Sequence, residues 1–66
     1  MSYIYTNLYQ MITQTGVSFK VMSDLIGISE DAFCEKLQGV SPWYLSEAML
    51  ICQYFHTTDV KHLFSN

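Results

Sequence analysis

The sequence predicts an all-α protein, a compact bundle of about five short helices that contains a helix-turn-helix. Apolar residues recur at the three- and four-residue spacing of amphipathic helices along most of the chain. Glycines and small polar residues separate these stretches where helices commonly end and begin. Because the chain has 66 residues, we expect one domain, residues 1–66.

Residues 19–39 are expected to form the helix-turn-helix, two helices joined by a short turn that contains glycine. Gly27 stands where the first helix should end, because glycine adopts a positive φ at little cost. Ser29 is expected to cap the second helix through its hydroxyl. The apolar positions of the first helix are Met22, Leu25 and Ile26.

The second helix of this unit is expected to run from Ser29 to Gly39. Glu30 and Asp31 fall in its first turn, where the helix dipole favours acidic side chains. Phe33 and Leu37 are four residues apart, so both should face the core.

The run at residues 22–29, MSDLIGIS, resembles the "leucine-alanine-x-x-leucine-glycine-isoleucine-serine" run of phage repressor and Cro helix-turn-helix proteins. This resemblance implies a DNA-binding transcriptional regulator that acts as a homodimer, with residues 29–39 in the major groove. It spans roughly Asn7 to Phe64 and is more specific for fold than for function. The other matching positions are Phe33, Lys36, Leu37, Gly39, Leu45, Ser46, Glu47, Ala48, Ile51, Leu63 and Phe64.

Before this unit, a first helix is expected from about Ile4 or Asn7 to Gln14, after a polar and aromatic lead, Met1 to Thr6. Gly16 should end that helix, and Ser18 should cap the next one.

After this unit, Pro42 disfavours helix at the residue before it, so residues 40–44 should form a loop. A fourth helix is expected from about Leu45 to Phe55, and a last short helix from Val60 to Phe64, capped by Asp59 or Thr58. The core-facing residues expected on the fourth helix are Leu45, Ala48, Ile51, Cys52 and Phe55.

The charge of the chain departs from that of a typical nucleic-acid binder. The net charge is −3, with three lysines, no arginine and six acidic residues, and specific DNA binding depends strongly on neutralised phosphates. Gln38 and Lys36 are the residues whose loss should weaken any DNA binding, which is expected to be weak. The candidate DNA-binding residues carried over from the resemblance are Ser18, Lys20, Ser29, Glu30, Asp31, Cys34, Glu35 and Gln38.

The chain is also rich in apolar residues, at 50% of its length, so part of that surface is expected to meet a partner. Trp, Tyr and Met are enriched in the centres of protein interfaces. The alternative is that half of the apolar side chains that the core stripe does not need pack under the loops. The candidate residues for a homodimer or partner interface are Trp43, Tyr44, Met49 and Leu50.

Other chemistry is less well supported by the sequence. Cys52 and His56 have a helical spacing suited to metal binding, with His62 as a third ligand, but a buried structural cysteine is favoured at position 52. Acidic neighbours should disfavour a thiolate at Cys34. We therefore expect no metal, no cofactor and no enzymatic activity. The absence of a signal peptide or membrane-spanning stretch and the two lone thiols predict a cytoplasmic protein.

Two functions remain open at this stage. The first is a small regulator from a phage or other mobile element that binds duplex DNA as a homodimer. The second is an acidic protein-binding module that keeps the fold without binding DNA, with a basic protein as its partner. An antirepressor, a repressor modulator or a phage inhibitor of a host nucleic-acid-binding protein would belong to this second class.

Overall fold

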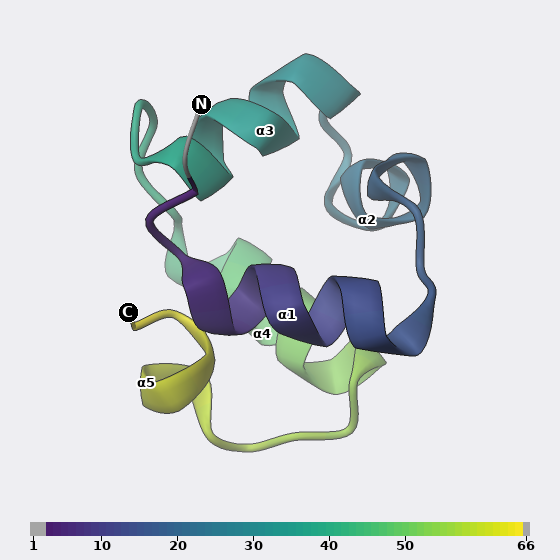
Figure 1. Cartoon of the computed structure of the whole chain (residues 1–66), viewed down its shortest axis with the longest axis vertical. Helices are drawn as coiled ribbons and strands as arrows, with labels where there is room; N and C mark the ends of the chain where they lie inside the picture. The colour runs from purple at the N-terminus through teal and green to yellow at the C-terminus, as the bar shows by residue number, and fades with distance from the viewer. Residues whose placement is uncertain (1–2, 66) are drawn as a thin grey trace.

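The computed structural model describes residues 3–65, and all regular structure in this part of the chain is α-helical (Figure 1). Met1 and Ser2 of the predicted lead and Asn66 at the end of the predicted domain lie outside the described residues. The helices form a compact bundle with extents of 26 × 23 × 23 Å, which confirms the predicted fold class. They are α1 (Thr6–Thr15), α2 (Phe19–Ile26), α3 (Glu30–Gln38), α4 (Leu45–Tyr54) and α5 (Val60–Leu63).

The helix-turn-helix forms as predicted, with α2 and α3 separated by three residues. Gly27 has a φ of +76°, and Ser29 accepts a hydrogen bond from the Ala32 amide at 3.1 Å. The predicted cap of α2 is also present, because the Ser18 hydroxyl accepts from the Val21 amide at 3.2 Å. The start of α2, the end of α2 and the start of α3 are therefore determined by the local sequence.

The segment before α1 is not helical, whereas one of the two predicted starts for the first helix is Ile4. The amides of Ile4 and Tyr5 both donate to the carbonyl oxygen of Leu37 in α3, at 3.1 and 3.3 Å. These long-range hydrogen bonds compete with a helical turn, so α1 begins only at Thr6. The other helix ends agree with the prediction to within one residue: α1 ends one residue later, at Thr15, and α4 and α5 end one residue earlier, before Phe55 and Phe64.

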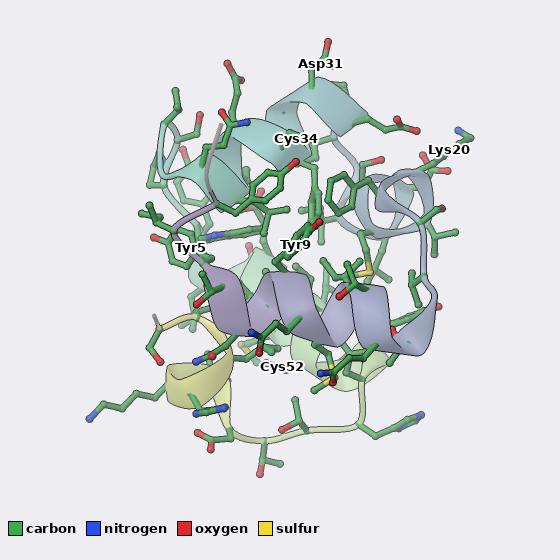
Figure 2. The ribbon with its side chains drawn as sticks, in the orientation of Figure 1. Tyr5, Tyr9, Lys20, Asp31, Cys34 and Cys52 are labelled. Carbon is green, nitrogen blue, oxygen red and sulfur yellow. The ribbon has the colours of Figure 1, made fainter. Side chains whose placement is uncertain are left out.

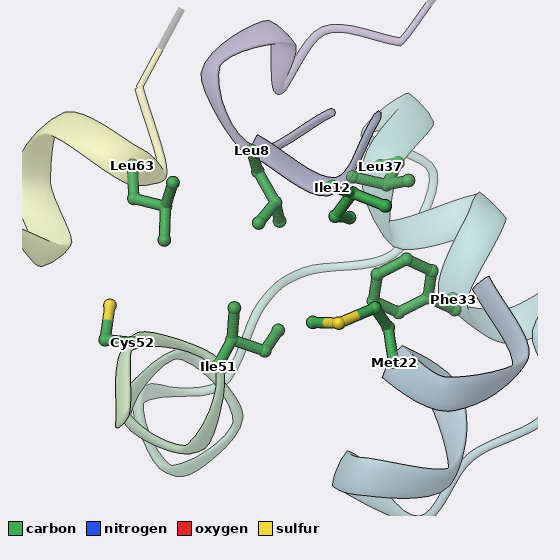
Figure 3. Packing of buried hydrophobic residues seen from close by; sticks show 8 residues of the cluster. All are labelled: Leu8, Ile12, Met22, Phe33, Leu37, Ile51, Cys52 and Leu63. Carbon is green, nitrogen blue, oxygen red and sulfur yellow. The ribbon is translucent and has the colours of Figure 1, made fainter. Parts of the chain in front are cut away.

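The core lies between the helices and receives side chains from all five of them (Figure 3). α1 crosses in front of α4 in Figure 1, with α2 and α3 above and α5 below. The eight core residues drawn in Figure 3 are Leu8, Ile12, Met22, Phe33, Leu37, Ile51, Cys52 and Leu63.

Aromatic rings extend this core in a continuous row from the N-terminal segment to the end of α5. At its centre, Phe33 lies 5.5 Å from Phe19 and 5.6 Å from Trp43, measured between ring centroids. Trp43 also contacts Tyr5 and Phe64, at 6.1 and 5.1 Å. The row therefore connects the loop before α4 to both ends of the described chain.

Leu45 is the clearest error in the predicted core, because its side chain is 70% exposed. It is the first residue of α4, and the space at that end of the helix is filled by other groups. The Trp43 ring packs on Phe33 there, and Lys36 pairs with Glu47. Leu45 is therefore left on the outer surface.

Gly39, which ends α3, provides a test of how the N-terminal segment is held. Its φ is +83°, and a Cβ at this position would overlap the side chain of Ile4. Gly39→Ala should therefore lower the free energy of unfolding by about 1–2 kcal/mol, from backbone strain, with a further loss from displacing Ile4.

Gly27→Ala is the matched control, because Gly27 has a similar φ and nothing within 4 Å of an added Cβ. Urea denaturation followed by circular dichroism should show a larger loss for Gly39→Ala than for Gly27→Ala. Equal losses would contradict the prediction and mean that the Ile4 side chain accommodates the added methyl group at no measurable cost.

Candidate functional site

The exposed side of α3 is strongly acidic. Glu30, Asp31 and Glu35 are exposed, as the predicted placement of this helix requires, and Cys34 and Gln38 are half-buried. Figure 2 shows Asp31 pointing away from the body of the molecule. Among the described residues, no lysine lies on this surface.

Lys36, the only basic residue of α3, is buried and only 6% exposed. Its ammonium group pairs with the Glu47 carboxylate at 2.9 Å and donates to the Pro42 carbonyl oxygen at 2.8 Å. The same group lies 4.7 Å from the centre of the Tyr44 ring and 5.7 Å from that of Trp43. Lys36 is therefore not placed to contact a DNA phosphate, because its charge is enclosed between α3 and α4, and the expectation that its loss weakens DNA binding stays a prediction.

The remaining two lysines do not compensate for the charge of α3. Lys20, a candidate for DNA binding, forms an exposed ion pair with Asp24 of the same helix, at 3.4 Å. Figure 2 shows Lys20 projecting outward from α2. Lys61 lies on α5, which also carries Asp59 at its start. The three lysines are balanced in number by three acidic residues outside the exposed side of α3, namely Asp24, Glu47 and Asp59. The net charge of −3 therefore equals the charge of Glu30, Asp31 and Glu35.

Cys34 lies beside the N-terminal segment rather than on an open surface. Tyr3 is a neighbour of the Cys34 thiol, and the Tyr3 ring stacks on Tyr9 at a centroid distance of 4.7 Å. Burial raises the pKa of the Cys34 thiol, and the nearby Asp31 and Glu30 carboxylates raise it further. The thiol form is favoured at neutral pH, as the sequence predicted, with burial as the larger cause.

Ser18 and Ser29, the two serines among the candidate DNA contacts, are exposed and act as helix caps. Each hydroxyl accepts from an amide three residues later, so its oxygen already satisfies one free N–H of the helix it begins.

The exposed side of α4 is a second candidate surface, and it is uncharged. Glu47 is the only charged residue of this helix and is turned toward Lys36 and the Tyr44 amide. We call the exposed apolar side chains here the α4 patch. Its members are Tyr44, Leu45, Met49, Leu50 and Tyr54.

The α4 patch contains three of the four residues predicted to form an interface. The fourth, Trp43, is half-buried in the aromatic row, and its indole Nε1 is buried with no hydrogen-bond partner among the described residues. Leu45 and Tyr54 were missed, Leu45 because its spacing placed it with the core. The four-residue spacing of Leu50 and Tyr54 would have identified the latter.

Within residues 3–65 the surface contains no pocket, and no three His, Cys, Asp or Glu side chains are placed to hold a metal ion. Cys52 is buried and His56 and His62 are exposed. None of the helices in this part of the chain has the length and apolar character needed to cross a bilayer. Comparisons of the chain with family models, with curated proteins and with solved structures give no match.

Proposed function

We propose that this domain is a protein-binding module that uses the helix-turn-helix fold to present an acidic helix, α3, to a basic surface of another protein. The single observation that carries the proposal is the location of the charge. Three exposed carboxylates lie on α3, while the lysine of that helix is buried against Glu47.

The same observation disfavours duplex DNA as the ligand of α3. A DNA-binding protein gains much of its affinity by neutralising phosphates and releasing counterions, and each such contact needs a cationic or N–H donor group. An α3 placed in the major groove would bring three carboxylates close to phosphates instead. A basic protein surface, such as the one another protein uses to bind nucleic acid, has the complementary charge.

The second candidate function is a transcriptional regulator that binds DNA weakly as a homodimer. The capped α2–turn–α3 arrangement supports it, because DNA-binding proteins place the second helix of such a unit in the major groove. Gln38 near the end of α3 offers an amide suited to adenine, although its side chain is half-buried.

Fluorescence polarisation at low salt separates the two functions. One probe is a labelled random-sequence DNA duplex, and the other is a labelled lysine- and arginine-rich helical peptide. We expect binding to the basic peptide, weakening as salt is added because the attraction is screened, and no binding to the duplex at tens of micromolar protein.

The matched variants are the triple change Glu30→Gln, Asp31→Asn and Glu35→Gln, and the control Asp24→Asn. The triple change should weaken peptide binding at least tenfold, while Asp24→Asn, which removes an acid from α2, should change it less than twofold. Binding to the duplex by the wild-type domain would contradict the proposal and favour the regulator. Peptide binding unaffected by the triple change would contradict the proposal by showing that the acidic residues of α3 do not form the binding surface.

A further inference from the structure

We infer that the basic partner is recognised through arginine, whose guanidinium group stacks on partly exposed aromatic rings beside the acidic side of α3 while it pairs with a carboxylate there. This inference rests on the proposed function, because it names the chemistry of the partner at that same surface. The rings belong to Tyr3, Tyr9 and Phe19, all half-buried, which we call the N-terminal aromatic cluster.

Three separate parts of the chain form this cluster. Tyr3 lies in the segment before α1, Tyr9 on α1 and Phe19 at the start of α2. The Tyr3 ring stacks on Tyr9 at 4.7 Å, and Phe19 meets the two rings edge-on at 6.1 and 6.2 Å, measured between centroids. The segment that carries Tyr3 is bound to α3, because the Ile4 amide donates to the Leu37 carbonyl oxygen at 3.1 Å. The fold therefore holds the cluster beside α3.

Cys34 connects the cluster to the acidic side of α3. Its thiol neighbours Tyr3, and Glu30 and Asp31 lie one helical turn before it, at spacings that place side chains next to each other on a helix. Burial raises the pKa of the thiol most, and the two carboxylates raise it further, as expected of charges close to the sulfur. Figure 2 shows Tyr9 between α1 and α3 and Asp31 farther out on α3. A side chain bound here would contact aromatic rings on one side and a carboxylate on the other.

Within the described residues, no lysine is paired with these rings or carboxylates. The lysine that lies over aromatic rings in this part of the chain is Lys36, and its rings are those of Trp43 and Tyr44. The acidic members of the ion pairs formed by residues 3–65 are Asp24 and Glu47, neither of which lies on α3. The N-terminal aromatic cluster and the carboxylates of α3 are thus left for a cation that a partner supplies.

Arginine fits this combination better than lysine. Its planar guanidinium group can stack on a tyrosine ring and at the same time donate two parallel hydrogen bonds to a carboxylate. The ammonium group of lysine is more strongly hydrated and cannot form that planar contact, so it gains less from the rings. Tyrosine and arginine are also both enriched among the residues that dominate binding in protein interfaces. The partner is therefore a basic surface or helix that presents arginine.

Fluorescence polarisation at low salt tests the inference with two labelled helical peptides that differ only at their basic positions, all arginine in one and all lysine in the other. Their charges are equal, so the general attraction to α3 acts on both alike. The arginine peptide should bind about fivefold more tightly. Tyr3→Leu and Tyr9→Leu should each weaken its binding about fivefold, the size expected of one cation–π contact at a partly exposed ring, and should change binding of the lysine peptide less than twofold.

Two control variants separate the loss of a ring from other effects. Tyr9→Phe keeps the ring and should keep most of the arginine preference. Tyr54→Leu removes an exposed tyrosine from α4 and should change neither affinity more than twofold. Circular dichroism of each variant excludes unfolding as the cause. Tyr3 lies outside the helices, so Tyr3→Leu provides the test if Tyr9→Leu does not fold.

Equal affinity for the two peptides, or an arginine preference that persists in both leucine variants, would overturn the inference. The proposed function would still stand in that case if the triple change of Glu30, Asp31 and Glu35 weakens binding of both peptides. Absence of binding by either peptide would contradict the proposed function and the inference together.

Discussion

Replacing Leu37 by alanine should leave much of the protein unfolded at 25 °C, whereas replacing Leu45 should have almost no effect on stability. Both residues are leucines in helices, but Leu37 is fully buried and Leu45 is 70% exposed. Truncating a buried leucine costs about 2–5 kcal/mol, because transfer free energy is lost and a cavity remains. A single core of this size supplies only about 3–5 kcal/mol in total, so Leu37→Ala removes most of it.

Urea denaturation monitored by circular dichroism measures this difference. Leu45→Ala should lie within about 0.5 kcal/mol of the wild type, as for most surface substitutions, since leucine and alanine are both good helix formers. Dilute protein should be used so that any dimer does not contribute. A loss for Leu45→Ala close to that for Leu37→Ala would show that Leu45 is buried in the folded monomer.

The contrast between these two leucines also shows what the sequence can predict. Helical spacing correctly predicted that Leu37 faces the core, because Phe33 and Leu37 lie on one side of a helix with caps at both ends. The same spacing assigned Leu45 to the core with Ala48 and Cys52. That assignment failed because periodicity identifies the direction of a side chain without saying whether another element covers it.

The candidate site was also predicted only in part: its exposed acidic residues were expected, but the burial of its lysine was not. The resemblance correctly implied that Glu30, Asp31 and Glu35 are exposed. Helical spacing places Asp31 and Glu35 opposite Phe33 and Leu37, whereas Glu30 has the same spacing as those core residues and is exposed in the first turn of α3. Neither the burial of Lys36 nor its pairing with Glu47 could be inferred locally. These two residues are eleven positions apart on different helices, and a lysine is rarely buried unless it is paired. The distribution of charge over the surface therefore became clear only from the structure.

The buried pair of Lys36 and Glu47 is the basis for the second large effect. Lys36→Met retains the length of the side chain but leaves the Glu47 carboxylate without a counterion and the Pro42 carbonyl without its donor. Removing one member of a buried ion pair typically costs about 3–5 kcal/mol, because an uncompensated charge remains in a poorly solvated place. We expect Lys36→Met to be largely unfolded at 25 °C.

The double change Lys36→Met with Glu47→Leu should restore much of this stability. Replacing both members of a buried pair by apolar side chains of similar size is often neutral, because neither charge then has to be desolvated. The Tyr44 amide, which now donates to Glu47 at 3.1 Å, is at the exposed start of α4 and can bond to water instead. A double-mutant cycle from urea denaturation gives the coupling energy of the pair.

Lys20 and Asp24 are the matched control within the same protein, an ion pair in which both side chains are about two-thirds exposed. Lys20→Met should change the free energy of unfolding by less than about 1 kcal/mol, because water already screens this pair. If Lys36→Met is no more costly than Lys20→Met, then Lys36 is solvated in solution and its charge is available on the surface of α3. In that case α3 would carry a smaller negative charge, and the argument against DNA binding would lose its main support.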